Sequence, residues 1–401
     1  MKRLVVGILA HVDSGKTTLS EGILYTAGEI RTLGRVDHGN AFLDTNTIER
    51  ERGITIFSKQ AVVRLKDTEF TLLDTPGHVD FSAETERTLS VLDCAILVIS
   101  GTDGVQSHTE TLWRLLKQHS IPTFLFINKM DLSDRTPEDI IEELCKKLDD
   151  GCVNFSEEFI ENAAMCDEEL MNIYLEQETL SEYAIGNAIA RRGIFPCFFG
   201  SALKLDGVRE FLEGLEQYTF APNTAEEFGA KIYKISADER GQRLTHLKVT
   251  GGILKVKDLI GKNNSAEKVN ELRVYSGEKF QNIREAFPGM VCAVVGPSET
   301  YAGQGLGTEQ NSSALTLEPV FTYCVKLPQG ADLHSAVNDL RRLEEEETQL
   351  HIIWNEQLRE IHIQLMGEVQ MEVLKRIIAE RFHLDVTFEK GSIIYKETIA
   401  D

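Results

Sequence analysis

The segment that most constrains the fold is the N-terminal run Leu4–Ala10, which leads directly into the loop AHVDSGKT ending at Thr17. The run is short and apolar, which is typical of a strand buried on both faces. The loop meets the pattern G-x-x-x-x-G-K-[ST] except at its first position, where alanine stands. A helical pattern follows from Lys16 to Thr26. This order predicts a phosphate-binding loop in a mostly parallel α/β sheet.

Each residue of this loop has a specific expected role. Asp13, Ser14 and Gly15 bring main-chain N–H groups to the helix N-terminus, where they face an anion. Lys16 would reach the β- and γ-phosphates, and the Thr17 hydroxyl would hold Mg²⁺. The alternative is an ordinary helix start with a surface lysine, and the strand and helix on either side argue against it.

The first half of the chain alternates short apolar runs with amphipathic segments, as expected for strands and helices of one sheet. Residues 61–65 are expected to form an antiparallel edge strand before the run 70–73. Residues 149–190 are expected to form a small helical insertion without a strong strand. The other predicted strands are 95–99, 123–127 and 195–199, and the other predicted helices are 82–89, 109–118 and 137–148.

The pattern changes twice in the second half, so we expect three domains. Residues 1–222 would be the P-loop domain, and residues 223–314, with short β-rich segments between glycine turns, an all-β barrel. Residues 315–401 show the order strand, helix, hairpin, helix, strand, which is typical of a ferredoxin-like α+β domain. The predicted fold class is therefore multidomain.

Two further segments are candidate sensors of a γ-phosphate. Asp74, in DTPGH, ends a predicted strand and can hold Mg²⁺ through water. Gly77 can offer its N–H to the γ-phosphate, and His78 is then placed to orient an attacking water. Thr55 lies in the long stretch 28–60 and can bind Mg²⁺ only when that loop is ordered. Taken alone, DTPG is a plain turn and Thr55 a strand-edge threonine.

The motif NKMD predicts a choice of guanine over adenine. The carboxylate of Asp131 can accept both N1–H and N2–H₂ of guanine, whereas adenine would leave this buried group unpaired at a cost of about 1–3 kcal/mol. Asn128 can meet the N7/O6 edge, and the Lys129 stem can cover the base plane. N–H groups of the triplet GSA, which includes Ser201 and Ala202, are expected to bind O6. The order and spacing of these motifs together indicate a GTPase.

Composition excludes several other classes of protein. The net charge of -22 argues against a general nucleic-acid-coating surface, so any RNA contact should be local. The seven cysteines form no Cys-x-x-Cys pair, which indicates a reduced, cytoplasmic protein without a disulfide framework. No apolar stretch reaches the length of a membrane span.

The sequence resembles the translational GTPases of the elongation factor G class. The resemblance rests on GILAHVDSGKTTL, ERERGITI, LLDTPGHVDF, VLDCAILVISGTDGVQ and INKMD, and near the end on LMGEVQMEVLKRI and IIYKETI. Within the class, GEIRTLGRVDHGN and LSVLDCAILVISGTDGVQSHTETL look closest to the tetracycline-resistance ribosomal protection proteins. The compact interval between Asp131 and Ser201 agrees with that choice.

The resemblance implies a GTPase domain, a translation-factor barrel and a ferredoxin-like third domain. It implies that GTP and GDP bind with Mg²⁺, that the ribosome is the partner, and that the protein is a monomer. By the resemblance, His78 positions the water and Thr17 and Thr55 hold the metal. The resemblance also implies a set of nucleotide-binding residues: Asp13, Ser14, Gly15, Lys16, Thr17, Thr18, Asn128, Lys129, Asp131, Ser201 and Ala202.

Some alternatives remain open at this point. The family continues with two more domains, so we expect this chain to be truncated after the third, able to hydrolyse GTP slowly but not to move tRNA or expel tetracycline. An elongation factor G-like translocase is one alternative. A nucleotide-gated ribosome-binding module with secondary hydrolysis is another, and a P-loop enzyme that uses ATP is a third.

Overall fold

The computed structural model describes residues 1–35, 41–43, 47–238, 240–261, 266–313, 315–356 and 358–390. The segment IIYKETI and part of GEIRTLGRVDHGN lie outside these described residues. The chain divides into two compact units. The first contains residues 1–78 and 84–314, and the second contains residues 79–83 and those from 315 onward. The predicted domain boundaries at 222 and 314 stay predictions.

The first unit is built around a seven-stranded sheet in which every strand except β2 runs parallel to its neighbours. Buried apolar side chains on successive positions explain why these runs form interior strands. The antiparallel edge strand β2 was predicted correctly. In sheet order the strands are β2 (Lys59–Arg64), β3 (Thr68–Asp74), β1 (Lys2–Ala10), β4 (Cys94–Ser100), β5 (Thr123–Asn128), β7 (Phe195–Phe199) and β6 (Cys152–Asn154).

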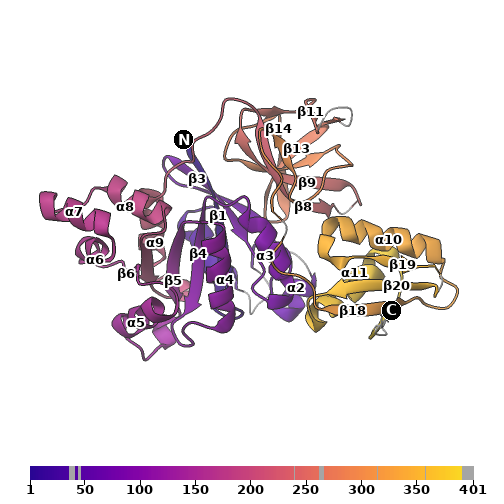
Figure 1. The fold of residues 1–401 in the computed structure, drawn as a ribbon, viewed down its shortest axis with the longest axis horizontal. Helices are drawn as coiled ribbons and strands as arrows, with labels where there is room; N and C mark the ends of the chain where they lie inside the picture. The colour runs from indigo at the N-terminus through magenta and orange to yellow at the C-terminus, as the bar shows by residue number, and fades with distance from the viewer. Residues whose placement is uncertain are drawn as a thin grey trace, which may run out of the picture. The chain divides into compact units, whose positions relative to one another are not determined.

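Helices cover this sheet on both sides, as Figure 1 shows for α4 and α9 on either side of β4 and β5. Helix α5 begins with a capping box: the Thr136 hydroxyl accepts from Asp139 N–H, and Pro137 stands at the first helical position. The main helices are α1 (Lys16–Thr26), α3 (Ser82–Leu89), α4 (Ser107–Gln118), α5 (Pro137–Lys147) and α9 (Val208–Tyr218).

The region 149–190 contains the expected helices and also a strand that the sequence analysis missed. The helices are α6 (Phe159–Cys166), α7 (Glu168–Gln177) and α8 (Glu182–Ala190). Strand β6 has only three residues and pairs with β7 in parallel, Cys152 opposite Phe195. Three residues are too few to show a period, so only the neighbouring strand reveals β6.

The rest of the first unit is β-rich, as predicted. Its main sheet is antiparallel and carries its own core, which includes Ile232, Leu247 and Val294. In sheet order its strands are β14 (Lys279–Ile283), β13 (Glu271–Ser276), β16 (Val291–Val295), β9 (Arg243–Gly251), β8 (Gly229–Ala237) and β17 (Gly305–Gly307). Two short ribbons pair β10 (Leu254–Lys255) with β15 (Glu285–Ala286) and β11 (Leu259–Ile260) with β12 (Glu267–Lys268).

Ion pairs join this β-rich part to the α/β part of the same unit. Lys248 of β9 lies 2.6 Å from Asp93, and Lys234 of β8 lies 2.8 Å from Glu84 of α3. All four side chains are largely buried. Pairing is required here, since an unpaired buried charge would cost several kcal/mol.

The second unit has the predicted βαββαβ order. Its antiparallel sheet runs β19-β20-β18-β21, so the first and third strands are central, as in ferredoxin-like folds. Alternate side chains such as Tyr323, Val325 and Ile363 pack against the helices. The elements are β18 (Phe321–Lys326), α10 (Leu333–Glu346), β19 (Ile353–Asn355), β20 (Glu360–Leu365), α11 (Glu368–Phe382) and β21 (Thr387–Lys390).

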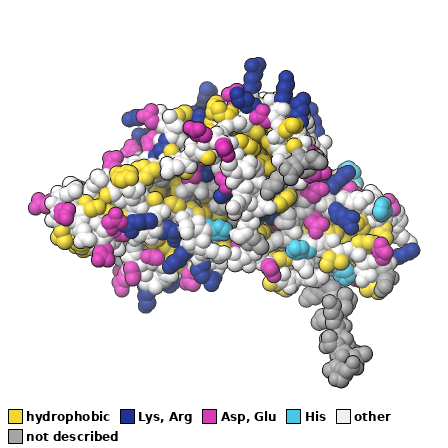
Figure 2. All heavy atoms as spheres, turned by 45° about the horizontal axis from the view of Figure 1, so that its top comes forward, with side chains coloured by type: hydrophobic (Ala, Val, Ile, Leu, Met, Phe, Trp, Pro, Cys, Tyr) yellow, Lys and Arg dark blue, Asp and Glu magenta, His cyan; other side chains and the backbone are white. Residues whose placement is uncertain are grey.

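Within the described ranges, every helix is too short or too polar to span a bilayer. Figure 2 shows acidic and basic side chains interspersed over one face of the molecule.

Candidate functional site

The loop between β1 and α1 has the geometry that its sequence predicts. Gly15 caps α1 with φ 87°, a left-handed conformation that favours glycine. A Cβ at this position would stand 2.2 Å from Nδ2 of Asn128, so glycine is required by space as well as by backbone angle. The loop therefore lies directly against the NKMD turn that follows β5.

Lys16 is buried at the start of α1 and faces two of the predicted sensors. Its Nζ lies 2.7 Å from Oδ2 of Asp74 and 3.0 Å from Oγ1 of Thr55. Asp74 is fully buried at the end of β3, and its other oxygen accepts from the Ser20 hydroxyl at 3.1 Å. The loop, the end of β3 and the Thr55 segment thus converge on one ammonium group.

The predicted metal ligands also lie together. Oγ1 of Thr17 and Oγ1 of Thr55 are 3.4 Å apart, and the Asp74 carboxylate is held next to Thr55 by Lys16. Magnesium prefers oxygen ligands at about 2.0–2.1 Å, so two oxygens at this separation can share one ion. This donor set fits Mg²⁺.

Helix α2 (Thr47–Arg52) supplies a positioning residue that the sequence analysis missed. Glu49 is fully buried, and its Oε1 accepts from the main-chain N–H groups of Ile56 (2.9 Å) and Phe57 (3.0 Å). Its Oε2 lies 3.1 Å from Lys59 Nζ. These bonds hold the chain immediately after Thr55. The irregular sequence around Glu49 carried no periodic signal for this role.

The turn after β3 packs against the phosphate loop. The N–H and hydroxyl of Thr75 both donate to the carbonyl of Ile8 in β1. A Cβ on Gly77 would lie 3.3 Å from the Ala10 carbonyl oxygen, a close approach that glycine alone makes easily. His78 follows and is half-buried at the wall of the same cavity.

Asn128 connects three loops through its side-chain amide. Its Nδ2 donates to the Ser14 carbonyl at 2.9 Å, and its Oδ1 accepts from Ala202 N–H at 2.9 Å. This differs from the predicted contact with the N7/O6 edge of guanine, which stays a prediction. The amide serves here to fasten the base-side loops to the phosphate loop.

The three N–H groups of the GSA triplet each donate within the protein in this structure. The expected contact of this triplet with O6 of guanine stays a prediction. Gly200 donates to the Ile127 carbonyl, Ser201 to Asp206 and Ala202 to Asn128. Buried main-chain donors are normally paired, and here the turn itself pairs them.

The carboxylate of Asp131 already has a partner within the protein. The Asp131 side chain is 17% exposed, and its Oδ2 lies 3.0 Å from Nζ of Lys204. A hydrogen bond from Ser201, followed by the contact with Lys204, lowers the pKa of Asp131. The Asp131 carboxylate is therefore an ionised hydrogen-bond acceptor at the cavity wall. A guanine base that binds there must share this carboxylate with the Lys204 ammonium.

A cavity of about 520 Å³ brings these motifs to one place. Ser14, Asp74 and Ala202 do not line it; they are buried and reach it through Asn128 and Lys16. The predicted residues that line the cavity are Asp13, Gly15, Lys16, Thr17, Thr18, Thr55, Gly77, His78, Asn128, Lys129, Asp131 and Ser201.

Two histidines near the turn were also missed. His11 lines the cavity, and His108 of α4 is buried with its ring centroid 6.0 Å from that of His11. Burial, with a smaller effect from the His11 ring, lowers the pKa of His108 to about 4. The ring is therefore neutral at pH 7. A lone histidine at a helix start carries no sequence signal for such a position.

Comparisons with known families agree with this geometry. The model of the elongation factor Tu GTP-binding domain matches residues 1–221. Those of elongation factor G domain 2 and elongation factor G domain III match residues 227–308 and 317–390. The first match alone covers more than half of the chain.

Similar curated proteins include two tetracycline resistance proteins. TetP of Clostridium perfringens is 31% identical over 99% of this chain, and TetS of Listeria monocytogenes is 30% identical over the same share. The chain spans 66% of the length of each.

A crystal structure of a Thermus thermophilus protein has the same fold, with a TM-score of 0.86 and 22% identity. It matches over 98% of this chain and 68% of its own. Given the three domain matches, the chain belongs to the elongation factor G-like family of translational GTPases.

Proposed function

We propose that this chain binds GTP and hydrolyses it to GDP and phosphate. The observation that carries the proposal is the convergence of Lys16, Thr17, Thr55 and Asp74 at one end of a cavity whose other end is lined by Asn128 and Asp131. This matches a triphosphate at one end and a guanine base at the other.

In this proposal the phosphate loop grips the β- and γ-phosphates. Lys16 exchanges the Asp74 carboxylate for phosphate oxygens, and the main-chain N–H groups at the start of α1 face the same charge. Gly77 donates its N–H to the γ-phosphate, and His78 orients a water for in-line attack on phosphorus. Asp131 accepts N1–H and N2–H₂ of the base in place of the Lys204 ammonium.

The proposal assigns Mg²⁺ to Thr17 and Thr55, with Asp74 acting through water. A bound ion there would neutralise charge that develops between the β- and γ-phosphates. Glu49 holds the Thr55 segment by hydrogen bonds to Ile56 and Phe57, so the ordered form of that segment depends on α2.

Replacing His78 by alanine tests the chemical step. We expect the H78A variant to bind GTP as the parent chain does but to lose single-turnover hydrolysis by roughly a hundredfold or more, as expected for loss of a residue that positions a reactant. The matched control is K16A, which should lose GTP binding itself. Hydrolysis by H78A at the parent rate would contradict the role of His78, and equal competition by ATP and GTP would revive the ATP alternative.

We further propose a ribosomal task of the kind carried out by ribosomal protection proteins, with the protein acting in the cytoplasm as a monomer. The support is that the curated relatives above are named tetracycline resistance proteins. Addition of ribosomes to this chain should raise its GTPase rate. A translocase-like factor is the alternative, and it is favoured if tRNA movement, rather than tetracycline sensitivity, responds to the protein.

A further inference from the structure

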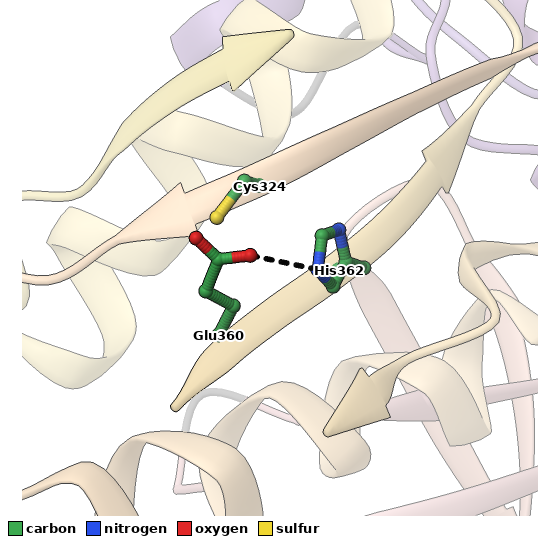
Figure 3. A group of neighbouring side chains, drawn as sticks. All are labelled: Cys324, Glu360 and His362. Atoms are coloured by element: carbon green, nitrogen blue, oxygen red, sulfur yellow. Dashed lines mark ion pairs between the residues drawn. The ribbon is translucent and has the colours of Figure 1, made fainter. Parts of the chain in front are cut away.

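Three potential metal ligands meet on the sheet of the second unit, far in sequence from the nucleotide cavity. Figure 3 shows Cys324 on β18 pointing toward Glu360 and His362, which both come from β20. Their donor atoms all lie within 4.8 Å of one another. Among the described residues, no other group of this kind combines three such ligands.

The strand register explains why these side chains meet. Cys324 is directly opposite His362 in the antiparallel pair of β18 and β20. Glu360 lies two residues before His362 and therefore shares its face of the sheet. Glu389 of β21 is opposite Cys324 on the other side. Because Tyr323 and Val325 belong to the core beneath the helices, these ligands occupy the opposite face.

Two of these three side chains are buried, unlike the side chains on a solvent-exposed face of a strand. Cys324 is 4% exposed and His362 is 9% exposed. Nε2 of His362 has no hydrogen-bond partner among the described residues, although it lies 3.3 Å from Oε2 of Glu360. A buried ring nitrogen beside a carboxylate and a thiol is a polar atom that a cation would satisfy.

The donor set selects the class of ion. Hard cations such as Mg²⁺ and Ca²⁺ prefer oxygen ligands only, whereas thiolate and imidazole suit Zn²⁺ and similar transition metals. With bonds of about 2.0–2.3 Å, donor atoms on one tetrahedral ion stand about 3.3–3.8 Å apart. Since the donor atoms here lie within 4.8 Å of one another, they need to approach by at most about 1 Å to share one ion.

We propose that Cys324, Glu360 and His362 form a binding site for a divalent transition-metal ion of the zinc class. Binding forms one metal–sulfur bond, and the thiol proton leaves to solvent. Water or the carboxylate of Glu389 takes the fourth position. The site belongs to the second unit and does not depend on GTP hydrolysis.

One cation already competes for these ligands. Nζ of Lys326 lies 3.4 Å from Glu360 and 3.7 Å from Glu389, and its side chain is 41% exposed. Metal binding therefore requires this ammonium to turn outward. Removing the charge with Lys326→Met should tighten metal binding, and this expectation distinguishes a built site from a thiol that binds metal by chance.

The test is a Co²⁺ titration of the full reduced chain, followed by absorption spectroscopy. One equivalent of Co²⁺ should produce a thiolate-to-cobalt charge-transfer band, and Zn²⁺ should remove it. Among the described residues, no cysteine lines the nucleotide cavity, so Co²⁺ bound there cannot produce this band, and the K16A variant and a titration beyond one equivalent show how much Co²⁺ the cavity takes. The K16A variant, which should not bind GTP, should show the same band as the parent chain.

Substitutions make the test specific. C324S should lose the band, H362A should bind Co²⁺ at least about tenfold more weakly, and K326M should bind it more tightly. The matched control is C166S, which changes an exposed cysteine on α6 and should keep the band. Circular dichroism checks that each variant is folded. The proposal is overturned if the parent chain shows no band at one equivalent, or if the band survives in C324S.

Discussion

The side-chain amide of Asn128 donates a hydrogen bond to the main-chain carbonyl of Ser14 at 2.9 Å, across 114 residues of sequence. The same amide accepts from Ala202 N–H. The phosphate side and the base side of the cavity are therefore joined through one buried side chain before any ligand is considered. A substitution in either loop should therefore change both the phosphate-binding side and the base-binding side of the cavity.

Gly15→Ala should abolish nucleotide binding. The added Cβ would stand 2.2 Å from Nδ2 of Asn128, and the backbone has φ 87°, so the change brings a clash as well as strain. Gly28→Ala is the matched control: φ is 81°, but nothing lies within 4 Å of the added carbon. The control should lose only about 1 kcal/mol of stability and keep GTP affinity. Equal GTP affinities for the two variants, measured by calorimetry, would refute the steric argument.

Asp131→Asn should change the choice of base. An amide can no longer accept from both N1–H and N2–H₂ of guanine, but it can donate to a base with a carbonyl in place of the 2-amino group. We expect GDP affinity to fall by roughly tenfold or more and xanthosine diphosphate to bind better than to the parent chain. Competition against a fluorescent nucleotide measures both. Unchanged preference for guanine would show that Asp131 does not contact the base.

Glu84→Gln should destabilise the first unit strongly. Burial tends to raise the pKa of Glu84, but Lys234 and Arg87 outweigh it and hold the pKa well below the usual range. The carboxylate also accepts from Ser58 N–H at 3.1 Å. Removing its charge takes the carboxylate away from the buried ammonium of Lys234, at an expected cost of about 3–5 kcal/mol.

The comparison for Glu84 is an exposed ion pair in the same unit. Glu285→Gln removes a carboxylate 3.1 Å from Lys255, where both side chains are well exposed, and should cost under about 1 kcal/mol. Adding Lys234→Met to Glu84→Gln should restore part of the loss, since one unpaired charge is then gone. The melting temperatures of the parent chain, the two single variants and the double variant test this prediction. Similar decreases in melting temperature for Glu84→Gln and Glu285→Gln would contradict it.

Acid should weaken the β-rich part through His246. Burial, together with the charge of Lys234, lowers the pKa of His246 to about 3. The unfolded chain takes up this proton near pH 6.5 and the folded chain does not, so stability is full above that pH and falls as the pH drops toward 3. The loss should reach roughly 3 kcal/mol by about pH 4.

His246→Gln removes this proton uptake and should flatten the decline in melting temperature between about pH 6.5 and 4. His334→Gln, at an exposed position on α10, is the control and should keep the parent profile. A parent-like slope in His246→Gln would assign the acid sensitivity to other groups.

Much of the α/β part was predictable because its strands are buried on both faces and read as uninterrupted apolar runs. Strand β7 and helix α1 begin and end at the predicted residues, and β1 to β5 differ by a few residues at their ends. Strand β6 was missed because three residues carry no period and its partner is 43 positions away, Cys152 opposite Phe195.

The site was predicted as a set of residues but not as a set of contacts. The motifs place Lys16, Thr55 and Asp74 at strand ends on one edge of a parallel sheet, and there they meet. Neighbours outside these motifs, Asp206 and Lys204 among them, supply partners for the GSA triplet and for Asp131, and no local pattern predicts these contacts.

The element order, the phosphate loop and the residue types that face a nucleotide could be predicted from the amino-acid sequence, since periodicity and local motifs are properties of short segments. Three contacts became visible only in the folded chain: Asn128 joins Ser14 to Ala202, Glu49 holds the chain after Thr55, and Cys324 faces His362. Each of these depends on strand register or on loop packing. A contact between two side chains that are far apart in the sequence produces no periodicity or motif, so it cannot be predicted from the sequence.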